Sequence, residues 1–178
     1  METLNQPVLD ASDYRLRPFE AKDTELIRSA SADSLIPLIT TVPTNGTNQE
    51  ILDFISRQHQ RLVDRSGYSF AIVEANSDQA VGQIGLWLKN SAQGRASIGY
   101  WVGPEHRNKG IVSTALDAIS RWGLSLPEIH RLELYVEPWN QGSWRAAERC
   151  AYIREGVLRS WQEVGGQRRD LYMYSRLK

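Results

Sequence analysis

The loop at residues 103–110 has the residue types that could bind a phosphate group. It follows a strand-like segment and precedes a helix-like one, and the first N–H groups of a helix are unpaired and carry partial positive charge. Gly110 would let a pyrophosphate approach the main chain, while Arg107 and Lys109 would add mobile positive charge. The loop matches neither the P-loop pattern nor the Gly-x-Gly-x-x-Gly of dinucleotide-binding folds. A phosphate site and an ordinary strand-to-helix turn both stay open.

A second polar group, Asn140-Gln141-Gly142-Ser143, directly follows another strand-like segment. Asn140 could simply cap the next helix, which is the common use of asparagine there, and Ser143 would then lie in the first turn. Alternatively, the Asn140 amide and the Ser143 hydroxyl lie at the same sheet edge as the 103–110 loop. The carboxyl ends of adjacent strands are where α/β sheets usually bind ligands.

Cysteine and histidine give no sign of further chemistry. Cys150 is the only cysteine, and it lies in a short apolar helix-like segment without a nearby histidine. We therefore interpret it as a packing residue rather than a nucleophile. The three histidines, His59, His106 and His130, lack metal-ligand spacing, and we expect no metal site.

The six tryptophans fall into two groups. Trp122 fits the apolar face of its helix, where it would pack in the core. The other five fall near strand ends and the Asn140 segment: Trp87, Trp101, Trp139, Trp144 and Trp161. They could pack in the core or a dimer interface, or they could form an aromatic wall for an acyl acceptor.

Hydrophobic spacing predicts the elements that position these groups. Residues 30–48 contain Pro37, Pro43 and Asn45-Gly46, which predicts an irregular loop. The order β-α-α-β-β-β-α-β-α-β-β predicts an α/β fold with a mixed, mostly antiparallel sheet and helices on both faces. The predicted strands are 14–19, 68–73, 80–87, 96–102, 131–136, 157–163 and 170–176, and the predicted helices begin at Asp23 and span 51–62, 111–126 and 141–151.

Composition limits the class of protein. A chain of 178 residues fits one domain, and 21 Lys and Arg balance 21 Asp and Glu, so we expect no nucleic-acid partner. A single cysteine excludes an intramolecular disulfide. No apolar run approaches ~18 residues and the start lacks a signal-peptide pattern, so we expect a cytoplasmic protein without a membrane partner. We expect residues 1–12 to be a flexible arm and residues 13–178 to form the domain.

Several short segments together form a specific sequence pattern through their order and spacing. They are Leu16-Arg17-Pro18 with Asp23, Ser69-Phe70-Ala71-Ile72, Val81-Gly82-Gln83-Ile84-Gly85-Leu86, Ile98-Gly99-Tyr100-Trp101-Val102, Arg107-Asn108-Lys109-Gly110-Ile111, Asn140-Gln141-Gly142-Ser143 and Glu155-Gly156-Val157-Leu158-Arg159. From Tyr14 to the C-terminus the chain resembles the GCN5-related N-acetyltransferase (GNAT) superfamily, in its RimJ/RimL-like branch. The resemblance implies a single GNAT-like domain that moves an acetyl group from acetyl-CoA to an amine, by direct attack in a ternary complex.

The resemblance also implies roles for individual residues. The segment from Arg107 to Val112 matches the acetyl-CoA signature, whose main-chain amides hold the pyrophosphate; Val112 stands where a small residue is usual. Residues 100–102 match the strand that pairs with the pantetheine arm and splays from its neighbour. Asn140 matches a pantetheine-binding residue and Ser143 the general acid. The implied cofactor-binding residues are Tyr100, Trp101, Val102, Arg107, Asn108, Lys109, Gly110, Ile111, Val112 and Asn140.

The general base is less evident. Two positions at which relatives carry a carboxylate hold Ser97 and Gln162 in this chain, and Glu163 faces the other side of its strand. Glu137 ends a strand and could reach the cleft through a water, or it could be a solvated carboxylate. The catalytic residues that we predict are Ser143 and Glu137, with a backbone N–H near Val102 polarising the thioester carbonyl.

The acceptor class stays open at this point. It would be a protein or peptide N-terminal amine or a small-molecule amine, with acetyl-CoA as cosubstrate and no metal. A homodimer is compatible with the terminal hairpin and the tryptophans. The departures at Ser97, Val112 and Gln162 leave an alternative, a non-catalytic module that binds or senses acyl-CoA.

Overall fold

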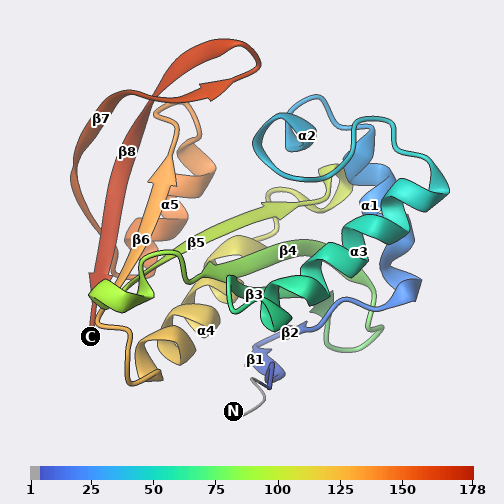
Figure 1. Ribbon diagram of the computed structural model, residues 1–178, viewed down its shortest axis with the longest axis horizontal. Coiled ribbons are helices and arrows are strands. Elements are labelled where there is room, and N and C mark those ends of the chain that lie inside the picture. The colour runs from blue at the N-terminus through green and yellow to red at the C-terminus, as the bar shows by residue number, and fades with distance from the viewer. Residues whose placement is uncertain (1–4) are drawn as a thin grey trace.

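Eight strands form one open sheet in the computed structural model, which describes residues 5–178 (Figure 1). The strand order is β1-β2-β3-β4-β5-β6-β8-β7, and only β5 and β6 are parallel. The predicted mixed, mostly antiparallel sheet is therefore confirmed. The strands are β1 (Leu9–Ala11), β2 (Tyr14–Arg17), β3 (Gly67–Glu74), β4 (Ala80–Trp87), β5 (Arg95–Val102), β6 (Arg131–Val136), β7 (Ile153–Val164) and β8 (Gln167–Leu177).

Helices cover both faces of this sheet, as predicted. Side chains alternate across a strand, so Phe70 and Ile72 of β3 join one core, whereas Ala71 and Val73 join the other. The first core packs against α4, and the second packs against α1 and α3. The helices are α1 (Thr24–Ser31), α2 (Ile36–Ile39), α3 (Asn48–Val63), α4 (Ile111–Ser125) and α5 (Gln141–Arg149).

The parallel pair β5 and β6 stays together for only part of its length. The two strands are in register from Arg95 to Ser97 and then diverge, as Figure 1 shows. Beyond that point β5 remains paired with β4 as far as Val102, and β6 remains paired with β8 as far as Val136. Alternate backbone groups of residues 98–102 point away from β4, so these groups have no sheet partner. This is the splayed strand that the resemblance implied.

Residues 9–11, expected to belong to a flexible arm, form the edge strand β1 instead. Leu9 to Ala11 pair with Leu16 to Tyr14, and the Gln6 side-chain amide donates to the Ser69 carbonyl at 2.7 Å. Such a short strand owes its existence to tertiary pairing rather than to its own sequence pattern. Residues 1–4, which also belong to the expected arm, lie outside the described residues.

Further boundaries differ from the sequence expectation, among them those of the segment 30–48 and of strand β7. The segment 30–48 contains the one-turn helix α2. At the start of this helix, Asp33 Oδ1 accepts hydrogen bonds at 2.9 Å from the backbone N–H groups of Leu35 and Ile36. Strand β7 begins at Ile153, earlier than predicted, because two register shifts against β8 interrupt its alternation. No helix within residues 5–178 combines the length and hydropathy that a membrane span requires.

Candidate active site

Two cavities adjoin the point where β5 and β6 separate. The first, which we call the sheet cavity, has a volume of about 420 Å³ and lies against Trp87, β5 and β6. The second, the loop cavity, has a volume of about 490 Å³ and is lined by residues 106–113 and by α5. Because some residues line both, the cavities meet in the splay. The shared residues are Leu35, Ile39, Tyr100, Trp101, Trp139, Asn140 and Ser143.

The loop cavity has the features of an anion site. The backbone is left-handed at Asn108, with φ 62°, and at Gly110, with φ 74°. Gly110 precedes the first turn of α4 and carries no side chain that could cap it, and a Cβ there would meet nothing within 4 Å. The N–H groups of Ile111, Val112 and Ser113 have no carbonyl one turn earlier in the helix to bond. They are therefore free to bind an anion at the positive end of the helix.

Arg107 is not the mobile positive charge that the sequence predicted. One of its terminal nitrogens donates to Asp33 Oδ2 at 2.8 Å, so the loop is tied to the segment before α2. Burial opposes the charge on Asp33, but backbone bonds from Ile36 and Leu35 and the Arg107 guanidinium together lower its pKa. Lys109 forms no ion pair in the part of the chain that the structure describes, and it remains the exposed cation of the loop.

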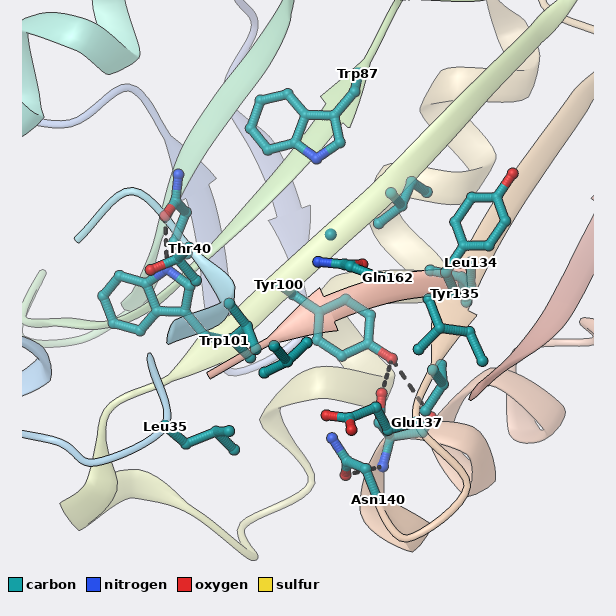
Figure 2. A pocket seen from close by; sticks show the side chains of 18 of the residues that line it. Leu35, Thr40, Trp87, Tyr100, Trp101, Leu134, Tyr135, Glu137, Asn140 and Gln162 are labelled. Atoms are coloured by element: carbon teal, nitrogen blue, oxygen red, sulfur yellow. Dashed lines mark hydrogen bonds between the residues drawn. The ribbon is translucent and has the colours of Figure 1, made fainter. Parts of the chain in front are cut away.

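Ser143 and Tyr100 form a hydroxyl pair where the cavities meet. Ser143 Oγ lies 2.7 Å from the Tyr100 hydroxyl, and Figure 2 shows this contact beside Asn140. Burial raises the pKa of Tyr100 to about 12, so the phenol stays protonated at neutral pH. Asn140 Oδ1 accepts a hydrogen bond from the Ser143 backbone N–H at 3.2 Å, which is the helix cap that its position allowed. The Asn140 side chain thereby orients the first turn that carries Ser143.

Glu137 is the only carboxylate among the described residues that line the sheet cavity. Its side chain is 11% exposed and lies 3.7 Å from Arg169 Nε. In Figure 2 it lies near the Tyr100 hydroxyl and Asn140. Ser97 instead occupies the last β5–β6 pair, opposite Glu133, while Gln162 lines the cavity with an amide. Among the described residues, the sheet cavity thus holds a carboxylate at Glu137 and a neutral amide at Gln162.

The sequence analysis missed the carboxylate of Glu133, which is buried beside the splay. Its Oε1 lies 2.8 Å from Arg131 Nε, and its Oε2 accepts a hydrogen bond from the Tyr135 hydroxyl at 2.8 Å. Burial by itself would raise the pKa of Glu133. The two bonds and the nearby Arg95 outweigh burial, so the net pKa is lowered. Glu133 is therefore a neutralised structural anion that orients Tyr135, a residue of the sheet cavity. The Arg131-x-Glu133-x-Tyr135 alternation on one strand face is the signal that could have revealed it.

Tryptophans form much of the wall of the sheet cavity. Trp87, Trp101 and Trp139 line it, which favours the aromatic-wall alternative for Trp87 and Trp139, whereas Trp101 is also packed in the second core. The Trp87 indole lies against two strand glycines, since a Cβ at Gly85 would come 2.3 Å from the ring and one at Gly99 would come 3.0 Å from Nε1. Trp122 packs edge-on against Tyr68 and Phe70 in the core, as expected.

Cys150 is a packing residue, as predicted. It is 5% exposed, and its thiol donates to the Ser113 carbonyl at 3.1 Å. Burial raises the pKa of this thiol, which disfavours the reactive thiolate. Within residues 5–178, no three His, Cys, Asp or Glu side chains come together as a group that could hold a metal ion.

Comparison with known proteins finds a matching family model, related sequences and solved structures of similar fold. The family model described as the acetyltransferase (GNAT) domain matches residues 14–152. The N-acetyltransferase p20 of Bacillus licheniformis is 26% identical over 163 residues, which cover 92% of each chain. The ribosomal-protein-serine acetyltransferase of Escherichia coli is 28% identical over 116 residues, which cover 65% of each chain. The solved structure of Mycobacterium smegmatis RimJ in complex with CoA-disulfide matches with a TM-score of 0.81 at 24% identity, covering 96% of this chain and 86% of that one.

Proposed function

The chain belongs to the acetyltransferase (GNAT) domain family, whose members are acetyl-CoA-dependent N-acetyltransferases, and we propose that it acetylates an amine that enters the sheet cavity. One observation carries the proposal. A cavity with an anion-binding loop and a cavity with an aromatic wall meet at the Tyr100–Ser143 hydroxyl pair. A thioester bound from one side and an amine bound from the other would come together there.

The residues of the loop cavity fit acetyl-CoA, which supplies an activated acetyl group. The N–H groups of Ile111 and Val112, with the open space at Gly110, suit the pyrophosphate. The Val112 side chain packs against the core, so its replacement of a small residue leaves the backbone donor in place. The unpaired backbone of residues 98–102 suits the amides of the pantetheine arm, and Asn140 keeps its Nδ2 donor because only Oδ1 serves the cap.

The chemistry follows from the groups at the junction. The amine nitrogen forms a bond to the thioester carbonyl carbon, and the carbon–sulfur bond breaks. Ser143 donates its hydroxyl proton to the departing sulfur, and Tyr100 returns a proton to Ser143 through their 2.7 Å contact. The Tyr100 phenolate then regains a proton from water as the products leave, and the proton taken from the amine is released to solvent. Glu137 accepts the proton that the amine loses, directly or through a water. A backbone N–H near Val102 stabilises the negative charge that develops on the carbonyl oxygen.

The test is a CoA-release assay with acetyl-CoA and a panel of peptides and small amines. We expect Ser143→Ala to lower kcat roughly 100-fold, because a positioned general acid contributes about that factor. Its affinity for acetyl-CoA, measured by calorimetry, should stay within about twofold of the parent value. Ser125→Ala is the matched control, because the Ser125 hydroxyl donates to the Trp122 carbonyl on the exposed end of α4, away from both cavities.

Two results would contradict the proposal as a whole, and a third would contradict the role of Ser143 alone. Acetyl-CoA binding without turnover of any amine would favour the non-catalytic acyl-CoA-binding module. Failure to bind acetyl-CoA would refute the role of the loop cavity. Unchanged kcat in Ser143→Ala would remove Ser143 as the acid and leave Tyr100 in that role.

A further inference from the structure

One end of the sheet cavity is built from an arginine stacked on a tryptophan. Arg61 of α3 lines this cavity, and its guanidinium carbon lies 4.6 Å from the centroid of the Trp87 ring. Gly85 and Gly99 leave the space in which the indole rests against the sheet. A guanidinium over the face of an indole is attracted by the negative charge of the ring's π-system.

A buried hydrogen-bond network holds Arg61 from the other side. Arg61 Nε donates to Gln58 Oε1 at 3.1 Å, and Gln58 is 1% exposed. The same oxygen accepts hydrogen bonds from Ser69 Oγ at 3.1 Å and from Gln83 Nε2 at 3.0 Å. Gln83 in turn accepts a hydrogen bond from Trp101 Nε1 at 2.6 Å, so the network reaches the wall of the cavity. The position of Arg61 is therefore set before any ligand binds.

The positive charge of Arg61 has no protein anion beside it. Within residues 5–178 its two terminal nitrogens donate no hydrogen bond, and Arg61 forms no ion pair. Other partly buried arginines are neutralised, as Arg17 is by Asp23 at 2.8 Å and Arg131 is by Glu155 at 2.7 Å. Burial and the neighbouring Arg57 lower the pKa of Arg61, whereas the anions raise the pKa values of Arg17 and Arg131.

We infer that Arg61 and Trp87 bind an anionic group of the acceptor, so that the substrate is a small amine with a carboxylate or phosphate remote from its nitrogen. The inference rests on the proposed function. Figure 2 shows Trp87 at one end of the cavity and Glu137 at the other, with Tyr100 between them. An acceptor of this class matches the positive charge at one end and the carboxylate at the other. The free fork of the guanidinium suits either anion.

The experiment compares acceptors with and without a remote negative charge. The carboxylate pair is a set of dipeptides with a free C-terminal acid and the same dipeptides as C-terminal amides. The phosphate pair is 3-aminopropyl phosphate and 3-aminopropanol. With saturating acetyl-CoA, we expect at least one anionic member to show a KM roughly 10- to 100-fold below that of its neutral partner, with kcat changed only a few-fold.

Arg61→Gln should remove this preference by raising the KM of the anionic acceptor alone. Arg61→Lys should retain part of it, because lysine keeps the charge but loses the planar fork. Arg121→Gln is the matched control: it deletes the same charge from an exposed position on α4 and should keep the parent preference. Circular dichroism and unfolding midpoints of each variant identify any loss of fold.

The outcomes separate this inference from the proposed function. Equal KM values for charged and neutral acceptors, or an equal effect of Arg61→Gln on both, would overturn the inference while amine turnover still supported the function. Calorimetry of the acids with CoA-loaded protein supplies a readout that does not need turnover. Arg61-dependent binding of an acid without acetylation would support the inference and contradict the function. Acids that neither bind nor react would overturn the inference.

Discussion

Tyr100 and Ser143 show how two residues can act as one donor although 43 positions separate them. Tyr100→Phe removes only the hydroxyl and keeps the strand backbone that we assign to the pantetheine arm. We expect kcat to fall about 10-fold, since Ser143 loses its source of protons. The Kd for acetyl-CoA should stay within about twofold. A larger loss of acetyl-CoA affinity than of kcat would show that Tyr100 acts mainly in binding.

The raised pKa of Tyr100 predicts that its role as a donor is independent of pH over the working range. Burial holds this pKa near 12, so the phenol is protonated and able to donate at all pH values below about 11. Any decline of kcat that the parent enzyme shows between pH 8 and 10 should therefore also be present in Tyr100→Phe, because it does not come from ionisation of the phenol. Steady-state rates across this range check it. Such a decline, present in the parent and absent from the variant, would contradict the assigned protonation state.

Sequence reasoning worked for residues whose roles depend on local context. Gly110 follows a strand and precedes a helix, and Asn140 starts another helix, so both could be placed from their neighbours alone. The pairing of Arg107 with Asp33 could not be predicted, because 74 positions separate them and only the fold brings them together. The same holds for Arg61 and Trp87, which meet across a helix and a strand.

At the scale of elements, the close packing of strands β4 and β5 under Trp87 provides a sharp test. Gly85→Ala would place a methyl group 2.3 Å from the indole, so the ring must move. We expect the free energy of unfolding to fall by about 1–3 kcal/mol, as overpacking usually costs. The KM for the acceptor should rise because the wall of the sheet cavity shifts. Denaturant unfolding and steady-state kinetics measure the two effects.

Gly156→Ala is the matched control, because a Cβ at Gly156 in β7 meets nothing within 4 Å. It makes the same substitution in a strand without a neighbour to displace, so both quantities should stay near the parent values. An equal loss in the two variants would mean that alanine is disfavoured in these strands for backbone reasons. The role of the indole would then be refuted.

Elements with a clear apolar run or alternation were predictable, and irregular ones were not. Strand β3 is buried on both faces and flanked by turn residues, so its limits were close to the predicted ones. Strand β1 has three residues, too few for any periodic signal, and it exists because β2 offers a free edge. The bulges of β7 hide its alternation, so its first residues could not be assigned from spacing.

At the scale of the whole molecule, the meeting of the two cavities predicts how substrates act together. A conjugate that joins the acceptor nitrogen to the CoA sulfur through a two-carbon bridge would occupy both cavities at once. We expect its affinity to exceed that of CoA or of the acceptor by about 100-fold, because the second contact becomes intramolecular. Competition calorimetry measures this gain. An affinity no better than that of CoA would show that the cavities do not communicate.

This junction also marks the limit of prediction from sequence. The fold class followed from the order of elements, since crossovers and hairpins leave few sheet arrangements. The volume and wall of a cavity depend on how far β5 and β6 diverge, and no residue pattern encodes that separation. Only the assembled sheet shows that Tyr100 borders both cavities.

The divergence of β5 from β6 has a consequence for the behaviour of the protein in a crowded solution. Unpaired strand edges invite pairing with other chains and so promote aggregation. Here the open edge of residues 98–102 lies inside the molecule, between α4, α5 and the two cavities, rather than at the rim of the sheet. A slender arm can reach it, but a strand from another chain would need room for its own side chains. The main-chain donors and acceptors of residues 98–102 are thus less open to strand pairing with another chain than those of the outer strands β1 and β7.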